Sequence, residues 1–482
     1  MELNNNKKIN WTLCCNCKGQ GKITRGPSKK RRRRYQRELK AFKINNDKEL
    51  YPQALSSNKD ICLTCTGSGL MASDSLTQID SNYPHIAIIG GGIGGTALAV
   101  ACLHRGIPFT LYERDQDFDT RSQGYGLTLQ QSSKAIAGLG IVSLDGAITS
   151  MRHIVHNTEG KIIGEWGIKK WLQTLPEKNS KRKNIHIARQ TLRSALLGQL
   201  QNTESIKWGH TLKKISLNKE GTLGLDFQKN EKKEMATADL IVGADGIRSL
   251  VRSHLIGENN TTLHYLGCIV ILGICSLKSI NNSNSSLLDS ATVFQTVNGH
   301  ERVYMMPYDD DSIMWQISFP LSEKKAKELH KKGPRFMKKE VITRLGQWHD
   351  PIPQILALTP ESKITGYPVY DRKLLEPKLL EHSGNATLIG DAAHPMSPFK
   401  GQGANQAILD ALNLARMISK ECQPDIDWRK IGLRKIVLNK FEKEMLERTA
   451  SKVLDSAIAV EQLHSDAVLH KGDQPRGRGI QG

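Results

Sequence analysis

Apolar residues and short glycine-rich breaks alternate from residue 84 onward in a way that predicts β-α-β structure. The run PHIAIIG at 84–90 has the continuous apolar character of a buried parallel strand. Glycines follow it, then a mostly apolar stretch of helical length at 96–105, then a second strand-like run, PFTLYE, at 108–113. Two parallel strands joined through a helix form a β-α-β unit.

Further strands and helices are predicted along the rest of the chain. The runs ADLIVGADG at 238–246 and ATLIGD at 386–391 predict buried strands that end in turns. Three strand-like runs within 264–319 have almost no helical pattern between them, which predicts a second, mostly antiparallel sheet. Helical spacing is present at 189–200 and dominates from residue 403 to about 466.

Composition is that of a globular chain of more than one domain. Of the 482 residues, 38% are hydrophobic and 24% are charged. The sequence shows no apolar run that approaches the ~20 residues of a membrane span. The polar start MELNNNKKIN also lacks the apolar core of a secretory signal. We therefore expect neither a membrane-spanning nor a secreted protein, and we expect a cytoplasmic location.

The net charge of +20 is concentrated near the N-terminus. Residues 1–70 contain 16 Lys and Arg against 5 Asp and Glu, and the bases from Lys29 to Arg34 are consecutive. Such a run can bind nucleic acid, an acidic membrane or an acidic protein, serve as a nuclear address, or lie in solvent. The sequence leaves a nucleic acid or protein partner of this segment open.

The same basic segment carries two CxxCxGxG motifs, which pair Cys14 with Cys17 and Cys62 with Cys65. Four thiolates are enough for one tetrahedral zinc ion. A pair of redox-active dithiols is the alternative interpretation. The motif resembles the cysteine-rich zinc domain of J-protein chaperones, which has four such repeats. We expect a zinc-binding module at 1–70, followed by a linker at 71–82.

The turn after the first strand of the β-α-β unit carries candidate nucleotide-binding chemistry. Gly90, Gly92 and Gly95 fit G-x-G-x-x-G. The first glycine allows the tight turn, the second lets a pyrophosphate approach the backbone, and the third allows close helix–strand packing. Glu113 ends the next strand, where its carboxylate can accept hydrogen bonds from ribose hydroxyls. This unit alone does not distinguish NAD from FAD.

Two further motifs favour FAD: ADGIRSLVR at 244–252 and GDAAHPMSPFKGQGANQAILDA at 390–411. Together with the glycine loop, they give the chain a resemblance to the group A flavin-dependent monooxygenases, the p-hydroxybenzoate hydroxylase-like family, over about residues 83–460. The layout is similar to that of the tetracycline-inactivating branch. The resemblance implies an FAD site made of Gly90, Gly92, Gly94, Gly95, Glu113, Arg114, Arg121, Arg189, Asp245, Gly246, Gly390, Asp391, Pro398, Gly401, Gln402 and Gly403.

The resemblance also implies an activity. The family uses NAD(P)H and dioxygen, through a C4a-hydroperoxyflavin, to oxygenate an aromatic or polycyclic small molecule. No acid–base residue is obligatory in this design, so none is assigned as catalytic, and His394 is expected to be structural. An FAD-dependent reductase or dehydrogenase, or a flavoprotein whose zinc module makes it chiefly an interaction protein, are the alternatives. The expected substrate-binding residues are Arg302, Tyr304, Met306, Trp315 and Phe399.

These inferences combine into an α/β fold. A Rossmann-type FAD-binding domain at 83–255 and 361–430 is interleaved with a mostly antiparallel substrate-binding sheet at 256–360. A long C-terminal helix at 431–468 and a disordered tail at 469–482 complete the expected organisation.

Overall fold

The computed structural model describes eight stretches of the chain. They are residues 9–45, 58–121, 125–130, 132–167, 184–200, 204–217, 222–280 and 285–477. The chain divides into two compact units, Met1–Gln78 and Ile79–Gly482. The expected linker at 71–82 therefore does not fall wholly between the units, because residues 70–73 are a strand of the first one.

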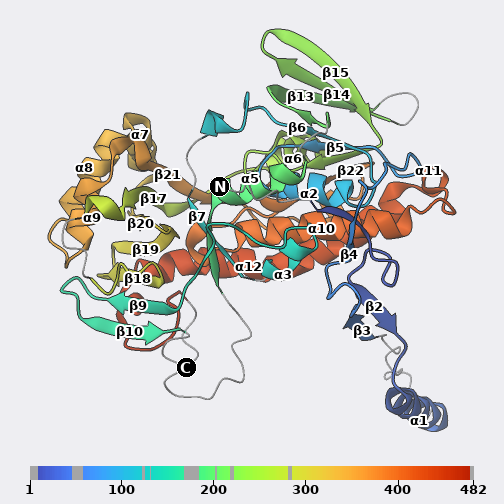
Figure 1. Cartoon of the computed structure of the whole chain (residues 1–482), viewed down its shortest axis with the longest axis horizontal. Helices are drawn as coiled ribbons and strands as arrows, with labels where there is room; N and C mark the ends of the chain where they lie inside the picture. The colour runs from blue at the N-terminus through green and yellow to red at the C-terminus, as the bar shows by residue number, and fades with distance from the viewer. Residues whose placement is uncertain are drawn as a thin grey trace, which may run out of the picture. The chain divides into compact units, whose positions relative to one another are not determined.

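The first unit consists of two short antiparallel hairpin-like sheets and one helix (Figure 1). Strands β1 (Asn10–Leu13) and β4 (Leu70–Ser73) pair with each other, as do β2 (Lys22–Arg25) and β3 (Asn58–Ile61). Helix α1 (Lys29–Asn45) contains the basic run and follows β2 in the chain. The two CxxC turns connect these strands, so strand pairing brings the two cysteine motifs together.

A five-stranded sheet forms the centre of the second unit, and every pair of neighbours in it is parallel. Its central strands are short, apolar and almost completely buried, as the sequence predicts for a sheet covered on both faces. In spatial order the strands are β12 (Ile206–Lys207), β6 (Phe109–Tyr112), β5 (Ile86–Ile89), β16 (Leu240–Gly243) and β22 (Ala386–Leu388).

Three helices cover one side of this sheet, and a three-stranded meander together with the short helix at 250–256 covers the other (Figure 1). The ring of Phe227 in the meander stacks on that of Tyr112 in β6, with 4.2 Å between ring centroids. The meander lies within the range expected for the FAD-binding domain, but its strands were not predicted. The elements are α2 (Ile93–Leu103), α5 (Arg189–Gln199), α10 (Gly403–Glu421), α6 (Leu250–Ile256), β13 (His210–Leu217), β14 (Leu223–Lys229) and β15 (Lys232–Ala238).

The expected second sheet has seven strands, and all neighbours except β9 and β18 are antiparallel. It is wider than the expected range 256–360, because strands from 152–166 and 364–371 join its two edges. In spatial order the strands are β10 (Ile162–Trp166), β9 (Arg152–His156), β18 (Thr292–Val297), β19 (Arg302–Asp309), β20 (Ser312–Pro320), β17 (His264–Ser276) and β21 (Ile364–Asp371).

One face of the seven-stranded sheet is sealed by helices α7 (Glu323–Lys332), α8 (Pro334–Leu345) and α9 (Ile352–Leu358). A small sheet between the two large ones contains β7 (Gly126–Leu129), β11 (Ile185–Ala188) and β8 (Ile148–Thr149). The remaining helices, α3 (Ser133–Ala137) and α11 (Trp428–Ile431), are short.

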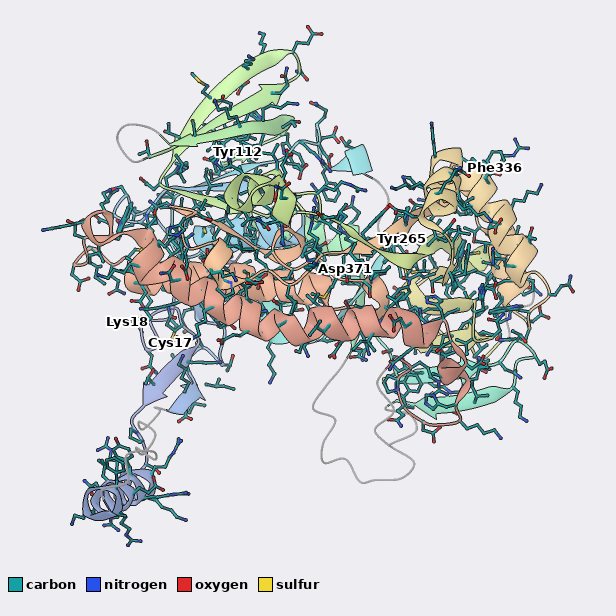
Figure 2. All side chains as sticks on the ribbon, turned by 180° about the vertical axis from the view of Figure 1, so that it is seen from behind. Cys17, Lys18, Tyr112, Tyr265, Phe336 and Asp371 are labelled. Carbon is teal, nitrogen blue, oxygen red and sulfur yellow. The ribbon has the colours of Figure 1, made fainter. Side chains whose placement is uncertain are left out.

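The long C-terminal helix α12 (Asn439–Leu463) continues a π-helical turn at Arg434–Leu438. Seen from behind, it runs the length of the unit from the parallel sheet to the second sheet (Figure 2). Phe441 packs in the core of the parallel sheet, whereas Ala459 packs with strands of the second sheet. Among the described helices, none combines the length and the apolar character needed to cross a membrane.

The chain remains ordered beyond the expected end of the fold. Residues 470–477 pack along β10, where the backbone N–H of Gly472 donates to the carbonyl of Ile163 at 3.1 Å. Arg476 is buried in this segment. The expectation of a disordered tail from residue 469 is therefore wrong up to residue 477, because one internal arginine provides an anchor that composition does not reveal.

Candidate functional site

Three motif loops meet at one edge of the parallel sheet. Ile89, Gly243 and Leu388 are level with one another at the carboxyl ends of β5, β16 and β22. The glycine loop and the ADG turn begin directly after Ile89 and Gly243, and the GDAAH loop begins at Gly390, two residues after Leu388. The chain leaves β5 toward β6 on one side and returns to β16 on the other, so this edge is a topological switch point, where open α/β sheets bind ligands.

The glycine loop is shaped by close backbone contacts at its first and third glycines. A Cβ on Gly90, which has φ +107°, would lie 2.5 Å from the carbonyl oxygen of Ala244. A Cβ on Gly95 would lie 1.9 Å from the carbonyl oxygen of Gly90. A Cβ on Gly92 would meet only a guanidinium nitrogen of Arg189, at 3.8 Å. The first and third glycines therefore serve packing, whereas the second leaves an open surface.

Glu113 is buried against this loop. Its Oε2 accepts a hydrogen bond from the backbone N–H of Gly91 at 2.6 Å, and its Oε1 accepts one from Asp115 at 3.0 Å. Arg193, which the motifs do not identify, donates from Nε to the carbonyl of Gly91 at 2.8 Å. Arg114, the next residue after Glu113, is exposed. The carboxylate is thus fixed at the place where the sequence predicts ribose recognition.

The second motif loop caps a helix. Oδ2 of Asp245 accepts hydrogen bonds from the N–H groups of Leu250 and Val251, at 2.8 and 3.3 Å, at the start of α6. Its Oδ1 is buried and has no hydrogen-bond partner in the described part of the chain. Burial raises the pKa of this carboxyl group. Gly246 has φ +81° and open space at its Cβ position, which leaves room beside the loop.

The third motif loop is held by buried ionic contacts. Oδ2 of Asp410 accepts hydrogen bonds from the backbone N–H of Gly390 at 2.9 Å and contacts Nε2 of His394 at 2.7 Å. Oδ1 of Asp410 accepts one from Arg448 at 2.7 Å. Burial alone would raise the pKa of Asp410, but the charges and hydrogen bonds of His394 and Arg448 outweigh it and lower that pKa. His394 is therefore one of the buried side chains that contact Asp410 and hold this loop.

Asp391 is the exposed acid of this loop. Its side chain lines a cavity. The walls of the cavity desolvate its carboxyl group, and this desolvation raises the pKa of that group. The guanidinium of Arg189 acts electrostatically on Asp391 and lies over the ring of Tyr125, 5.8 Å from its centroid. The described structure therefore brings Arg189, Gly92 and Asp391 to the same region. The side chain of Arg121 and the whole of Gly124, which the sequence associates with this region, lie outside the described residues.

Helix α10 begins beside Asp391, with its N-terminus at the cavity. Gly401, Gln402 and Gly403 all line the cavity, and Gly401 adopts φ +59°. The side chain of Asn405 holds the neighbouring strand β7, because its Nδ2 donates to the carbonyl of Thr128 at 2.8 Å. Free N–H groups at a helix N-terminus favour negative charge.

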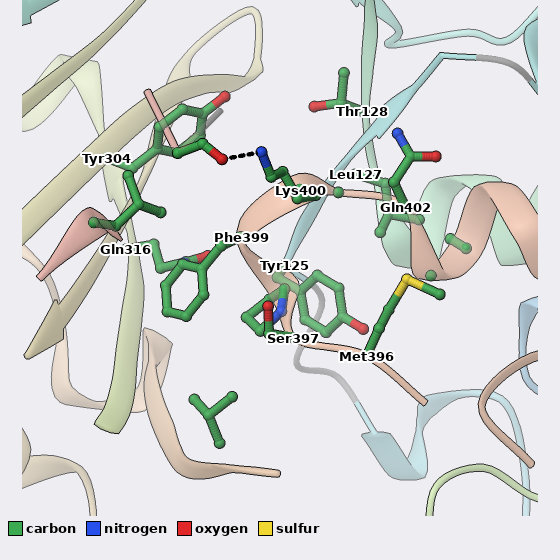
Figure 3. A pocket seen from close by; sticks show the side chains of 18 of the residues that line it. Tyr125, Leu127, Thr128, Tyr304, Gln316, Met396, Ser397, Phe399, Lys400 and Gln402 are labelled. Carbon is green, nitrogen blue, oxygen red and sulfur yellow. Dashed lines mark hydrogen bonds between the residues drawn. The ribbon is translucent and has the colours of Figure 1, made fainter. Parts of the chain in front are cut away.

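The cavity has a volume of about 2320 Å³ and lies between the parallel sheet and the seven-stranded sheet. Figure 3 shows Tyr304 and Gln316 on the strands of the second sheet, across the cavity from Gln402. Expected residues that line it are Arg302, Tyr304, Met306, Phe399 and Pro398. Residues that the motifs do not indicate also line it, including His153, Trp166, His186, Gln295 and the tail residues Gln474 to Gly477.

Trp315 does not line the cavity. It is paired with Met305 across β19 and β20, and so it faces the opposite side of the sheet from Met314 and Gln316. Its indole N–H donates to Oγ1 of Thr359 at 2.8 Å beneath the helices. The prediction that Trp315 contacts the substrate is therefore wrong. The pairing of β20 with β19 sets the face on which each residue lies, and it places Trp315 in the core.

The four cysteines of the first unit form a compact buried cluster. All four Sγ atoms lie within 4.8 Å of one another, with 3.9 Å between Cys14 and Cys62 and 3.6 Å between Cys17 and Cys65. The backbone N–H of Gly21 donates to Sγ of Cys17 at 3.2 Å, and Gly69 makes the equivalent contact to Cys65. The glycines of the motif thus turn the backbone so that its donors face sulfur.

The chain shares its main unit with known flavoproteins. Residues 84–423 match the family described as "FAD binding domain". The chain is 29% identical over 344 residues to the Aurachin C monooxygenase/isomerase of Stigmatella aurantiaca, with 70% of this chain and 81% of that protein covered. It is 28% identical over 354 residues to the chloroplastic zeaxanthin epoxidase of Solanum lycopersicum, with 70% of this chain covered, and it spans about half (48%) of that relative's length.

A solved structure shares the fold. Klebsiella pneumoniae HpxO, complexed with FAD and uric acid, aligns with a TM-score of 0.63 and 19% identity, covering 79% of this chain and 88% of that one. Together with the parallel sheet and the long C-terminal helix, this likeness confirms the predicted α/β FAD-binding fold.

Proposed function

The chain belongs to the family of proteins with this FAD-binding domain and is an FAD-dependent monooxygenase, and we propose that it uses NAD(P)H and dioxygen to oxygenate an aromatic or polycyclic small molecule. One observation carries the proposal. The three motif loops meet at the carboxyl edge of a single parallel sheet, and the third of them opens onto a cavity of about 2320 Å³.

The residues at this edge fit FAD. The open surface at Gly92 leaves room for a pyrophosphate, with Arg189 beside it to neutralise phosphate charge. Glu113 is fixed where it can accept ribose hydroxyls. Asp391 offers an exposed carboxylate at the cavity for a ribityl hydroxyl. The unpartnered Oδ1 of Asp245 is a further buried acceptor at the same edge, of the kind that a ligand donor satisfies.

Bound FAD would supply the chemistry that activates dioxygen after it is reduced by NAD(P)H. The protein contributes position, charge and exclusion of water. The N-terminus of α10, with Gln402 and Gly403 at the cavity, stabilises negative charge on a group held against it. Asp410 and Arg448 hold the GDAAH loop that carries Asp391. The apolar side chains of Met306 and Phe399 line the space next to this helix and exclude water from it.

The cofactor assignment is tested by two conservative substitutions. Glu113→Gln and Asp391→Asn should each weaken FAD binding about ten-fold or more, because a hydrogen bond to a charged group contributes roughly 1.5–3 kcal/mol. FAD affinity is measured by titrating the apoprotein and following flavin fluorescence. Glu328→Gln, on the exposed face of α7, is the matched control. Unchanged FAD affinity in both variants would contradict the assignment.

The activity is tested by following oxygen. Purified protein should show flavin absorbance, and NAD(P)H oxidation should insert one atom of isotopically labelled dioxygen into an aromatic substrate. NADH and NADPH are compared in the same assay. A flavoprotein that oxidises NAD(P)H with aromatic substrates but never inserts labelled oxygen would instead be the reductase or dehydrogenase.

For the first unit, we propose a structural zinc ion held by Cys14, Cys17, Cys62 and Cys65. Zinc bound to thiolates with bonds of about 2.3 Å in a tetrahedron requires sulfurs roughly 3.8 Å apart, and the measured separations of 3.9 and 3.6 Å agree with this. The N–H donors of Gly21 and Gly69 fit thiolate sulfur. Metal analysis should find about one zinc per chain. If the double variant Cys62→Ser, Cys65→Ser still contains about one zinc per chain, this cluster is not the zinc site.

We also propose a reducing, cytoplasmic compartment. All nine cysteines of the chain are described and none is in a disulfide bond, including four buried ones scattered through the second unit. Fractionation of cells that contain the protein tests this location.

A further inference from the structure

Arg302 is a buried arginine in the wall of the cavity. It lies on β19, and only 6% of its surface is exposed. Its Nε donates to Oε1 of Gln295 on the neighbouring strand β18 at 2.9 Å. Its guanidinium lies over the ring of Tyr304 at 5.0 Å and over the ring of Phe399 at 5.9 Å. These contacts fix the plane of the guanidinium and its direction into the cavity.

The terminal nitrogens of Arg302 make no hydrogen bond or ion pair with the described part of the protein. They are also not among the buried atoms sealed off without a partner, so they are open to the cavity that the residue lines. Desolvation lowers the pKa of Arg302 to about 10, which still leaves the side chain positively charged at neutral pH. A positive charge therefore faces the cavity, and the N–H donors of both terminal nitrogens are unused within the described protein.

Three other arginines of the second unit, one buried and two half-buried, each donate from at least one terminal nitrogen to a protein acceptor. Arg434 pairs with Glu442 at 2.9 Å, and Arg448 pairs with Asp410 at 2.7 Å. Arg252 donates to the carbonyls of Ala392 and Ala393. Burying a charge without such a partner is costly. Arg302 thus differs from them in the way expected of a residue whose partner is a ligand.

The surroundings of Arg302 suit an aromatic ring with one polar edge. Met306 and Met314 form an apolar patch on the same face of the sheet, and Phe399 faces them from the loop before α10. Gln316 and Tyr304 supply the remaining polar tips (Figure 3). Two carboxylates line the cavity, Asp391 and Asp455, and neither is among the groups that shift the pKa of Arg302.

We propose that Arg302 binds an anionic oxygen group on the substrate, so that the molecule this monooxygenase oxygenates is an aromatic acid. The inference rests on the proposed function, which identifies the cavity as the substrate site. It goes beyond that function by specifying that the substrate is negatively charged. The anion would form charge-assisted hydrogen bonds to the two open nitrogens of Arg302. The aromatic body would then lie along Met306, Met314 and Phe399, toward the N-terminus of α10.

The test compares two ligands of nearly the same shape, one anionic and one neutral. Full-length protein as purified is titrated by calorimetry with 2-naphthoate and with 2-naphthamide, without NAD(P)H. We expect naphthoate to bind at least about ten-fold more tightly than naphthamide, since a hydrogen bond to a charged group is stronger than a neutral one. Equal affinities, or no detectable binding of naphthoate, would overturn the inference without the need for any variant.

Substitutions then assign the preference to Arg302. In Arg302→Met the preference for naphthoate should disappear while naphthamide affinity stays within about two-fold. Arg302→Lys should keep part of the preference, and it serves as the charged variant if the methionine substitution does not fold. Arg335→Met, on the exposed part of α8, is the matched control and should behave as wild type. A preference that survives in both Arg302 variants would place the anion site elsewhere and overturn the inference.

Failure of this inference is distinguishable from failure of the proposed function. Calorimetric binding needs neither flavin nor turnover, so it reports on the anion site alone. Protein that contains no flavin, or that never inserts oxygen, speaks against the monooxygenase. Flavin-containing, oxygen-inserting protein that does not distinguish naphthoate from naphthamide speaks against the role of Arg302 only.

Discussion

Four histidines in the part of the molecule around the seven-stranded sheet are held neutral by burial. Desolvation lowers the pKa of His186 to about 3, and that of His153, His156 and His464 to about 4. Nδ1 of His186 contacts Oγ1 of Thr128 at 3.0 Å, whereas its Nε2 has no described partner. Because these rings resist protonation, they make a poor source of protons at neutral pH and act as packing groups.

This burial makes stability depend on pH. Below about pH 6.5 the unfolded chain takes up protons on these histidines and the folded chain does not, until the pH approaches 4. The free energy of unfolding is therefore expected to be highest above pH 6.5 and to fall between pH 6.5 and 4. Each histidine can contribute up to about 1.4 kcal/mol per pH unit in this window. Urea unfolding at pH 7.0 and 5.5 measures the change.

A variant tests whether His186 contributes to this pH dependence of the free energy of unfolding. His186→Asn keeps a side-chain partner for Thr128 and removes one titrating ring, so its stability should fall less steeply between the two pH values. His382→Asn, at an exposed position, is the control and should keep the slope of the wild type. Identical slopes in the wild type and in His186→Asn would show that this histidine does not cause the effect.

At the scale of elements, the glycines in the turn between β5 and α2 have two different roles. Some are needed for packing, and another leaves space for a ligand. A Cβ on Gly95 would collide with the backbone of Gly90, at 1.9 Å. Gly92 has φ −73°, which any residue adopts, and its Cβ position is open. The same glycine-rich motif therefore contains two positions required by the fold, Gly90 and Gly95, and one, Gly92, at which a side chain would meet little of the protein.

Two alanine substitutions in this turn should have opposite effects. Gly95→Ala should destabilise the apoprotein by about 1–3 kcal/mol, because the added methyl group forces the helix away from the strand. Gly92→Ala should leave the free energy of unfolding within about 0.5 kcal/mol and weaken FAD binding, because its methyl group occupies the pyrophosphate surface. Urea unfolding and FAD titration provide the two readouts. Wild-type FAD affinity in Gly92→Ala would mean that the pyrophosphate does not approach this glycine.

The C-terminal segment 470–477 is an element in its own right, held mainly by Arg476. The guanidinium donates to the carbonyls of His470 at 2.6 Å, Gly472 at 2.9 Å and Ile163 at 3.1 Å. Lys400, in the loop before α10, also donates to the carbonyl of Gly477. The segment therefore connects the edge of the second sheet to the FAD motif and forms part of the cavity wall.

Removal of the Arg476 guanidinium should release this segment. In Arg476→Ala, a broad-specificity protease should cleave within 470–477 at least several-fold faster than in the wild type, because four backbone carbonyls, that of Gln474 included, lose their donor. Lys471→Ala, at an exposed position in the same segment, is the control. Mass spectrometry of the fragments locates the cut. Equal cleavage in the wild type and in both variants would show that Arg476 is not the anchor.

At the scale of the whole molecule, the two units have separate cores and separate strand pairing. β1 pairs with β4 and β2 with β3 within the first unit, and the cysteine cluster is its buried centre. The FAD edge and the cavity are built entirely from residues of the second unit. Each unit is therefore expected to keep its own cofactor independently.

Deletion of residues 1–78 tests this independence. The remaining chain should bind FAD with an affinity within about two-fold of the wild type and should contain no zinc. Chelation of zinc from the full-length protein should likewise leave the flavin spectrum unchanged. Loss of flavin from the truncated chain would show that the second unit requires the first in order to bind FAD. That result would contradict the predicted independence of the two units.

Local sequence patterns determined the parts of the fold that depend on neighbours in the chain. The order of strand, glycine loop and helix at 86–103 follows from apolar runs and from positions where only glycine fits, such as Gly90. The order of the three motifs along the chain also identified the FAD family, which the family match over 84–423 confirms. Each CxxCxGxG motif likewise forms its own turn, and pairing of β1 with β4 and of β2 with β3 then brings the four cysteines together.

Only the tertiary structure decided which distant residues meet. Pairing of β19 with β20 turned Trp315 into the core and Met314 toward the cavity, and a shift of one residue would have reversed them. The contact between Asp410 and Arg448 joins two helices whose spacing in the chain carries no signal. The open nitrogens of Arg302 belong to this second class. Whether a buried charge has a partner is a property of all the surfaces packed around it, so it is invisible in the sequence.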